Sequence, residues 1–520
     1  MKASGRGKAG NLPQNSRICA EKAPKGAGTP ALKKNPCASV FIRGLKNFCL
    51  GVFAEKNTRA FPRKRYFSET MKSLARISAA VLAASLLALS ASAGTPPETP
   101  ARVPVIAGDD DHAPVFETRA ERDARMKWWR NAKFGMFIHF GLYSGLAGEW
   151  RGKYAGGEWI QKNVETDTET YRAEAFPRFK PSADAAEQWA ALAQEAGCRY
   201  AVLTTKHHDG FALFDSAQTD YDARDRFGRD LVREFTDAFR SRGIRVGFYH
   251  SVIDWSHPNY DYTICPQLCY PRGQIAWREG VPGREIDHAA YLRHLKNQVR
   301  ELLTNYGKID VLWWDYSQGA ASGKRGWDAP ALIEMCRGLQ PDVVMNNRLY
   351  AYGGFDTNAD VRLDLRCGDH MAPEKHIPAH GYPDTDWESC MTIGHHWGYS
   401  KGDGGFKSAE TVIRQLEECT AKGGNLLLNI GPKGDGSVPE NVAAVFRAVG
   451  AWLRVNGEAI YGTRPYFGFE GVFASQSADG KFAYVFLPPA GTPLPENLPE
   501  GEILGGDPNA LCPVLKIELR

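Results

Sequence analysis

Two adjacent histidines, His207 and His208, follow an apolar run at residues 200–203, in the segment TTKHHDGFALF (204–214). A short apolar run of this kind, bounded by polar residues, is consistent with a buried strand. Imidazole nitrogens at the end of a strand can bind a metal ion or the hydroxyl groups of a sugar. The alternative is a pair of ordinary surface histidines, and the residues that follow the other apolar runs must decide.

Chemically active side chains follow most of the remaining apolar runs. Asp315 ends the segment DVLWWD (310–315), directly after Trp313 and Trp314. Each such residue has an ordinary role available, for example a helix cap for an aspartate or a surface ion pair for an arginine. If the strands form one barrel, however, these side chains converge at its carboxyl end and form a site. The others, in chain order, are His139, Glu149, Trp150, Tyr249, His250, Asn346, Asn347, Arg348, Glu374 and Glu388.

A metal site is one chemistry that these residue types support, because imidazoles and carboxylates bind zinc. The first strand ends in IHFG (138–141), with no second histidine two residues on, and the last ends in NIGP (429–432), without an aspartate. A barrel metallohydrolase is therefore the less favoured alternative, and we expect neither a metal nor another cofactor.

Sugar hydrolysis suits the same residues better. Retaining glycosidases need two carboxyl groups ~5–5.5 Å apart, one to attack the sugar and one to protonate the leaving oxygen. Asp315, held on a strand beside tryptophan, suits the attacking group. Neutral histidines and tryptophan N–H groups suit the recognition of hydroxyls.

The spacing of the apolar runs predicts the fold that positions these residues. The runs do not alternate with polar residues, as expected for strands covered on both faces, and amphipathic segments at 182–198, 230–242, 287–306 and 407–422 predict helices between them. This pattern predicts an α/β fold with a (β/α)8-like TIM barrel over residues 121–460. A doubly wound open sheet is the alternative, but no GxGxxG motif follows the first strand. The strand-like runs are 135–138, 200–203, 245–249, 310–314, 343–345, 389–393 and 425–429.

The two ends of the chain differ in composition from the barrel. Residues 461–520 are rich in Gly, Pro, Phe and Val, with a strand-like run at 482–486, and predict a short C-terminal β-sandwich-type domain. Residues 94–120 form a Pro-rich linker or tail. Residues 71–93 combine a basic start at Met71, an apolar stretch and a small-residue site near Ala93, as a secretory signal peptide does. Residues 1–70 then form a disordered upstream extension, the alternative being a genuine basic extension with an internal membrane anchor.

Charge and cysteine content limit the partners of the exported part. Residues 1–93 hold 17 of the 64 basic and three of the 60 acidic side chains, so the remainder carries about −10 and is not expected to bind nucleic acid. We expect a secreted or periplasmic protein without a membrane span after cleavage. Cys265 and Cys269 are close enough in sequence to form a disulfide, whereas the other cysteines after residue 93 are equally consistent with buried thiols.

Several motifs in this order resemble the retaining α-L-fucosidases of glycoside hydrolase family 29. They span residues 128–436 and are specific, above all KHHDGF and the last segment. They are WWRNAKFGMFIHFGLYS (128–144), GEW (148–150), TTKHHDGFALF (204–214), GFYHS (247–251) with DW (254–255), DVLWWD (310–315), NNR (346–348), PE (373–374), WESC (387–390), WGYS (397–400) and GGNLLLNIGPKGDG (423–436).

The resemblance implies a barrel followed by a β-sandwich, with Asp315 as the nucleophile. It implies Glu374 as the general acid and base, and Glu388 is the rival for that role. Trp313 and Trp397 are suited to form an apolar wall against the methyl group of fucose. The residues expected to bind the sugar are His139, Glu149, Trp150, His207, His208, Tyr249, His250, Trp313, Arg348 and Trp397.

The resulting hypothesis is an exo-acting, retaining α-L-fucosidase that acts on fucosylated oligosaccharides or glycoprotein glycans. A non-catalytic fucose-binding barrel is the main alternative. The fucosyl linkage, the leaving group and the oligomeric state remain open.

Overall fold

The computed structural model describes residues 104–519, apart from residues 265–269, 281–284, 319–320, 351–362, 383, 490 and 496–497. The expected signal peptide and upstream extension therefore lie outside the described residues, as do Cys265 and Cys269. The remaining six cysteines after residue 93 are free and buried, as expected for core thiols. No helix within the described part of the chain has the length and apolar character needed to cross a membrane.

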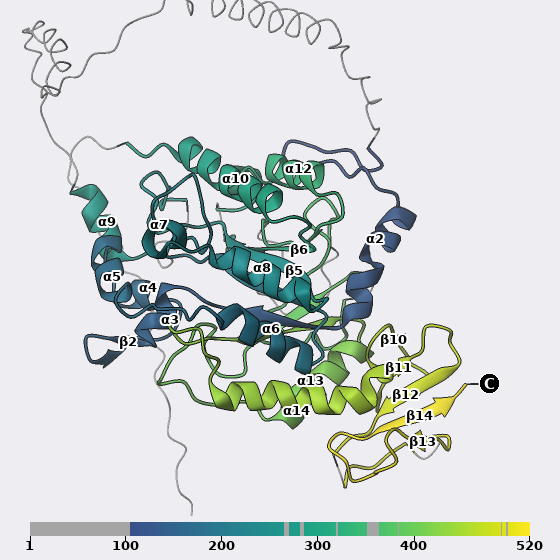
Figure 1. Cartoon of the computed structure of the whole chain (residues 1–520). Coiled ribbons are helices and arrows are strands. Elements are labelled where there is room, and N and C mark those ends of the chain that lie inside the picture. The colour runs from purple at the N-terminus through teal and green to yellow at the C-terminus, as the bar shows by residue number, and fades with distance from the viewer. Residues whose placement is uncertain are drawn as a thin grey trace, which may run out of the picture. The chain divides into compact units, whose positions relative to one another are not determined.

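A parallel sheet curls around the centre of the structure (Figure 1). Its strands follow the order β7-β6-β5-β4-β1-β9-β8, and every neighbouring pair is parallel. Nearly every side chain in them is buried, which explains why the strands read as continuous apolar runs. The strands are β1 Phe134–Ile138, β4 Tyr200–Lys206, β5 Arg245–Ser251, β6 Val311–Asp315, β7 Val344–Met345, β8 Glu388–Met391 and β9 Asn425–Ile430.

An eighth segment, residues 370–374, closes the barrel between β7 and β8. It forms a parallel bridge to Asn346 on one side and parallel bridges to Trp387 and Cys390 on the other. Its sequence, HMAPE, has no apolar run and contains a proline, which donates no backbone hydrogen bond. The sequence therefore predicts a loop here, whereas in the structure the segment is a short strand-like part of the barrel wall with Glu374 at its carboxyl end. The predicted (β/α)8-like barrel is confirmed.

Helices cover the outside of the barrel. The four predicted helices lie within three residues of the expected positions at both ends. Three of them begin after a polar side chain that caps the first turn: Asp230, Asp287 and Ser408 each accept a hydrogen bond from the backbone three residues on. The longer helices are α2 Arg119–Ala132, α6 Ala185–Glu195, α8 Leu231–Ser241, α10 His288–Asn305, α12 Ala329–Leu339, α13 Ala409–Ala421 and α14 Glu440–Asn456. The shorter ones are α3 Leu142–Leu146, α4 Ile160–Asn163, α5 Thr168–Ala175, α7 Ala223–Phe227, α9 Arg272–Glu279 and α11 Gly323–Trp327.

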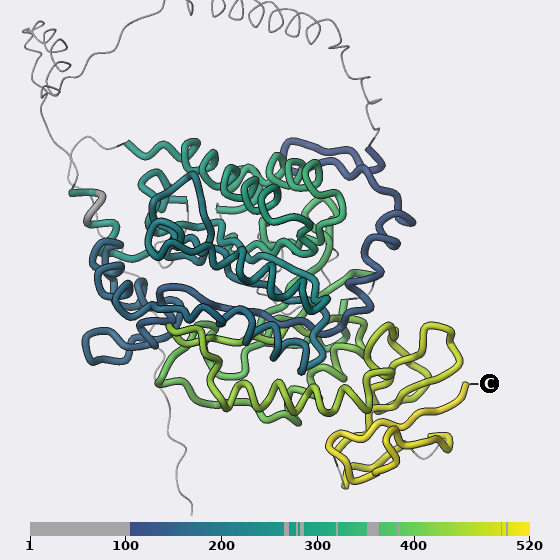
Figure 2. Tube along the Cα trace, viewed as in Figure 1, coloured from purple at the N-terminus to yellow at the C-terminus, as the bar shows by residue number. Residues whose placement is uncertain are grey.

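The C-terminal residues form an antiparallel sheet that packs beside α13 and α14 (Figure 2). Arg414 of α13 donates a hydrogen bond of 2.5 Å to the carbonyl of Leu487, and Trp452 of α14 donates one of 2.9 Å to the carbonyl of Cys512. The predicted small β domain after the barrel is confirmed. In sheet order its strands are β10 Arg464–Pro465, β11 Phe473–Gln476, β12 Phe482–Phe486, β14 Val514–Glu518 and β13 Glu502–Ile503.

Candidate active site

Asp315 is the last residue of β6 and lies at the carboxyl end of the barrel. The Tyr249 hydroxyl donates to its Oδ2 at 2.8 Å, and Nη1 of Arg348 donates to its Oδ1 at 2.9 Å. Nε2 of His208 lies 3.8 Å from Oδ2. The Asp315 side chain keeps 14% of its surface exposed, so the carboxylate is held rigidly and remains accessible.

Glu374 shares its arginine with Asp315. Nη1 of Arg348 also lies 3.0 Å from Oε2 of Glu374, and the indole N–H of Trp397 donates to the other oxygen at 3.1 Å. Since the 2.9 and 3.0 Å contacts meet at one nitrogen, the two carboxylate oxygens are at most about 6 Å apart, which fits the ~5–5.5 Å expected between the carboxyl groups of a retaining glycosidase.

Arg348 is fully charged despite its burial. Burial disfavours the charge, but the neighbouring Glu374 and Asp315 carboxylates outweigh it and raise the pKa of the guanidinium. The guanidinium also lies 4.5 Å from the centre of the Trp313 ring, which forms the floor beneath it. The buried guanidinium of Arg348 therefore holds the carboxylates of Asp315 and Glu374 in place.

Three buried histidines, His139, His207 and His208, also line the barrel mouth. Burial lowers the pKa of His139 and His208 to about 3 and the pKa of His207 well below its usual range, so all three are neutral near pH 7. Nδ1 of His139 is 2.7 Å from the Asn429 side-chain oxygen, so this nitrogen carries the proton and Nε2 is an acceptor. The buried Nδ1 of His207 has no hydrogen-bond partner among the described residues, as expected of a group that meets a ligand or water.

Aromatic rings complete the wall of the site. The Trp397 ring stacks on His139 with centroids 4.9 Å apart, and Phe137 lies 5.7 Å from Trp397. On the other side Tyr249 stacks on Trp313 at 5.7 Å. The mouth therefore combines an apolar wall with neutral hydroxyl-binding groups and a pair of carboxylates.

The motif GEW occurs twice, and the structure places the second copy in the site. Glu158 is buried and accepts hydrogen bonds from the backbone N–H groups of Trp397 and Gly398 at 3.1 and 2.9 Å. Trp159 packs edge to face against His208, with centroids 5.2 Å apart. Burial raises the pKa of Glu158.

The first copy, predicted from the sequence to line the pocket, lies elsewhere. Glu149 and Trp150 form the short strand β2 (Glu149–Trp150), which pairs with β3 (Lys153–Tyr154) in a hairpin at the surface, and both side chains are only half buried. This corrects their placement in the fucose pocket. The repeat at 157–159, nine residues further on, was the signal that could have found Glu158 and Trp159.

His250 and Glu388 also lie away from the pair of carboxylates. Successive residues of a strand point to opposite faces, so with Tyr249 facing the barrel interior His250 points outward, where it contacts Thr205 at 3.0 Å. Glu388 begins β8, at the amino end of that strand, and is buried beneath Trp313, whose indole N–H donates to it at 3.2 Å. The placement of His250 in the pocket is therefore wrong, and Glu388 lies below it.

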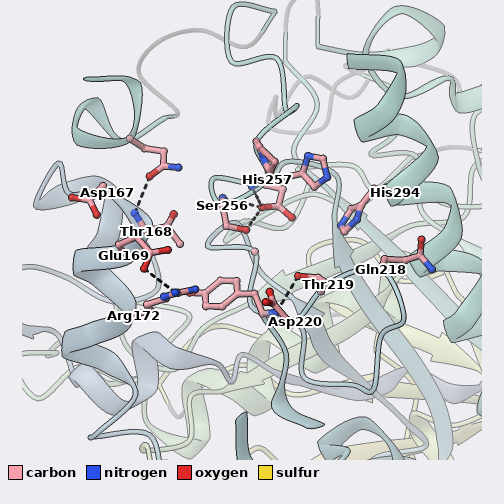
Figure 3. Close-up of a pocket in the computed structure, with 15 residues that line it drawn as sticks. Asp167, Thr168, Glu169, Arg172, Gln218, Thr219, Asp220, Ser256, His257 and His294 are labelled. Carbon is pink, nitrogen blue, oxygen red and sulfur yellow. Dashed lines mark hydrogen bonds and ion pairs between the residues drawn. The ribbon is translucent and has the colours of Figure 1, made fainter. Parts of the chain in front are cut away.

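A separate polar hollow of about 450 Å³ lies beside the site (Figure 3). Glu169 and Arg172 line one side of it, and His257 and His294 line the other. Asp254 lines this hollow, and the backbone N–H of the next residue, Trp255, bonds the carbonyl of His208 at 2.8 Å. Neither of the two paired carboxylates lines the hollow.

The fold and the paired carboxylates define a glycoside hydrolase of the barrel class, and comparison with known proteins identifies the family. The family model described as "Alpha-L-fucosidase" matches residues 109–458. Plasma alpha-L-fucosidase of Homo sapiens is 34% identical over 367 residues, which are 66% of this chain and 71% of that protein. The alpha-L-fucosidase of Dictyostelium discoideum is 28% identical over 415 residues, 73% of this chain and 83% of that protein.

Solved structures agree with these relatives. Alpha-L-fucosidase isoenzyme 1 from Paenibacillus thiaminolyticus superposes with a TM-score of 0.64 and 37% identity, covering 76% of this chain and 94% of that one. A trapped covalent intermediate of an alpha-L-fucosidase from Bacteroides thetaiotaomicron, in complex with 2-fluoro-fucosyl fluoride, gives 0.63 and 28% identity, with 80% and 95% covered. The chain belongs to the alpha-L-fucosidase family. The prediction of a retaining α-L-fucosidase is confirmed, and neither alternative finds support.

Proposed function

We propose that Asp315 is the nucleophile and Glu374 the general acid and base of this α-L-fucosidase. The observation that carries the assignment is Arg348, which contacts both carboxylates at one nitrogen and holds them at a spacing suited to a retaining mechanism. The covalent intermediate trapped in the Bacteroides relative supports the same route.

The reaction then proceeds in two displacements. Glu374 donates its proton to the glycosidic oxygen while Asp315 attacks C1 from the opposite side, so that the C1–O bond breaks and a fucosyl ester forms on Asp315. The Glu374 carboxylate next takes a proton from water, which attacks C1 and releases L-fucose with its configuration retained. No other reactant is consumed.

The fucose pocket in this proposal comprises the residues that surround the two acids. Each neutral histidine can offer a ring nitrogen to the sugar hydroxyls. In His139 and His208 this nitrogen is Nε2, because their Nδ1 atoms already contact Asn429 and Ser251 at 2.7 Å. Trp397 and Trp313 supply apolar surface for the methyl group. The proposed sugar-binding residues are His139, Glu158, Trp159, His207, His208, Tyr249, Trp313, Arg348 and Trp397.

We also propose that the protein is exported and acts on fucosylated oligosaccharides or glycoprotein glycans as an exo-enzyme. The signal-peptide pattern at residues 71–93 supports export. In this proposal residues 121–460 form the catalytic domain and residues 461–520 an accessory domain.

The test is the hydrolysis of an aryl α-L-fucoside by the wild-type protein and by Asp315→Ala, with and without azide. We expect wild-type turnover, its loss in the variant, and partial recovery with azide as the β-L-fucosyl azide, because azide attacks from the face that the aspartate has left. Recovery of an α-azide, or an active Asp315→Ala variant without azide, would overturn the assignment.

A further inference from the structure

A second hollow, of about 500 Å³, opens beside His396, the residue that precedes Trp397. It lies between the β2–β3 hairpin and the segment that leads to Trp397, and we call it the hairpin hollow. Its lining includes Trp150, Tyr154, Gly156, Asn163 and His396. The proposed reaction assigns no role to any of these side chains.

Two chain segments lead directly from the hairpin hollow into the active site. Gly156 lines the hollow and stands two residues before Glu158. His396 lines it and is followed by Trp397, whose indole N–H bonds Glu374 at 3.1 Å. Because Glu374 must reach the glycosidic oxygen, the leaving group extends towards the side of the site where Glu374 and Trp397 lie. The hairpin hollow is on that side.

The Tyr154 ring is held in place although 60% of the residue is exposed. Its hydroxyl is 3.2 Å from Nε2 of His396, and Asp403 fixes the other nitrogen of that ring at 3.2 Å. The ring also packs closely over Gly402, where an added Cβ would lie only 2.7 Å from Tyr154 Cδ2 and Cε2. A glycine at this position therefore lets the tyrosine ring lie against the backbone, with much of its surface open to solvent.

A fixed aromatic ring next to polar side chains is a surface suited to a sugar. The flat ring covers the apolar C–H face of a pyranose, and the polar groups at the rim bond its hydroxyls. Here the rim groups are Lys153 and Asn163, and the Asn163 amide also donates to the Ala155 carbonyl at 2.9 Å. The half-buried Trp150 adds further aromatic surface within the same hollow.

We propose that the hairpin hollow binds the sugar residue to which the fucose is attached, with that pyranose packed on the Tyr154 ring. This inference rests on the proposed roles of Glu374 and Asp315. It gives the hairpin that carries the first GEW copy a role in the choice of leaving group instead of in fucose binding.

The test compares two substrates in the full-length protein. One is a trisaccharide in which fucose is linked to N-acetyllactosamine, and the other is α-L-fucosyl fluoride, whose leaving group is a single atom. We expect Tyr154→Ala to lower kcat/KM for the trisaccharide about tenfold, equivalent to about 1.4 kcal/mol, and to leave kcat/KM for the fluoride within twofold. Tyr154→Phe, which keeps the ring, should stay within threefold of wild type on both.

Phe467→Ala serves as the matched control, since Phe467 is 81% exposed and lies next to β10 (Arg464–Pro465), in the C-terminal part of the chain. It should change neither rate. Equal losses on both substrates with Tyr154→Ala, or no loss on either, would overturn the proposal. A wild-type protein that hydrolyses neither substrate would instead refute the proposed function, so the two failures are distinguishable.

Discussion

Glu374→Gln and Glu388→Gln should behave differently towards substrates with good and poor leaving groups. Burial raises the pKa of Glu388, which is a property expected of a general acid. Position nevertheless excludes it, because a general acid must lie within hydrogen-bond reach of the oxygen that it protonates. The comparison of these two variants therefore tests whether position or a raised pKa decides which glutamate is the general acid.

The strand register gives the distance between Glu388 and the mouth of the barrel. Glu388 pairs with Asn425 on β9, whereas the side chain of Asn429, four residues further along β9, holds His139 at the barrel mouth. At ~3.3 Å per residue, Glu388 lies roughly 13 Å below that level along the strand, and roughly 7 Å below Cys390, the residue with which Glu374 forms its bridge. Its carboxyl group is also occupied by the hydroxyl of Tyr200 and the indole N–H of Trp313.

We expect Glu374→Gln to lower kcat/KM by about 10²- to 10⁴-fold for a fucosylated trisaccharide, as for loss of a general acid. The loss should be less than about tenfold for fucosyl fluoride, since fluoride leaves with little assistance from an acid. Glu388→Gln should lower both rates by the same small factor and reduce the free energy of unfolding by about 1–3 kcal/mol, because the amide cannot accept from both donors as well as the carboxyl group does.

Steady-state kinetics on both substrates, with thermal or urea unfolding of each variant, provides the measurement. A leaving-group dependence in Glu388→Gln that is absent from Glu374→Gln would refute the reasoning from register. The wild-type protein and the surface variant Phe467→Ala provide the reference values.

Three further predictions follow from individual residues. Glu158→Gln should lower kcat/KM for fucosyl fluoride by at least about tenfold, because hydrogen bonds to a charged group contribute ~1.5–3 kcal/mol each. Glu149→Gln should leave kcat/KM within twofold of the wild-type value. Equal losses of kcat/KM in the two variants would contradict the assignment of the second GEW copy to the site. His250→Gln should lower the melting temperature without changing KM for fucosyl fluoride, since the ring faces away from the site, and a raised KM would contradict that placement. Burial raises the pKa of Asp209 to about 7, above the ~3.9 of an unfolded aspartate. The free energy of unfolding should therefore fall as the pH rises from about 4 to 7 and level off above pH 7. Asp209→Asn should lack this fall in urea unfolding, and parallel curves of unfolding free energy against pH for the two proteins would contradict a protonated Asp209.

Much of the fold could be predicted because burial leaves a local pattern. Strands covered on both faces are apolar throughout, and helices with one buried face show apolar residues every three or four positions. The barrel segment at 370–374 could not be predicted in this way, since it contains a proline, has polar residues at both ends and shows neither apolar pattern. The outward orientation of His250 could have been predicted from the sequence. Side chains alternate along β5, so His250 must point to the face opposite that of Tyr249.

Local sequence also could not choose between equivalent motifs. GEW at 148–150 and at 157–159 is the same three residues, and only the packing of Glu158 under the backbone of Trp397 distinguishes them. Local sequence likewise could not choose between Glu374 and Glu388, although the structure places Glu374 at the end of the segment 370–374 and Glu388 at the start of β8.

The sequence by itself determined the barrel, the position of Asp315 at the end of a strand, and the supply of histidines and tryptophans around the mouth. These features depend on burial and strand direction, which neighbouring residues encode. Only the tertiary structure decided which carboxylate stands opposite Asp315, which GEW copy enters the site and which histidines face it. Those choices depend on closing the barrel, because closure brings Arg348, from the segment after β7, and Trp397, from the loop after β8, within hydrogen-bond distance of Glu374.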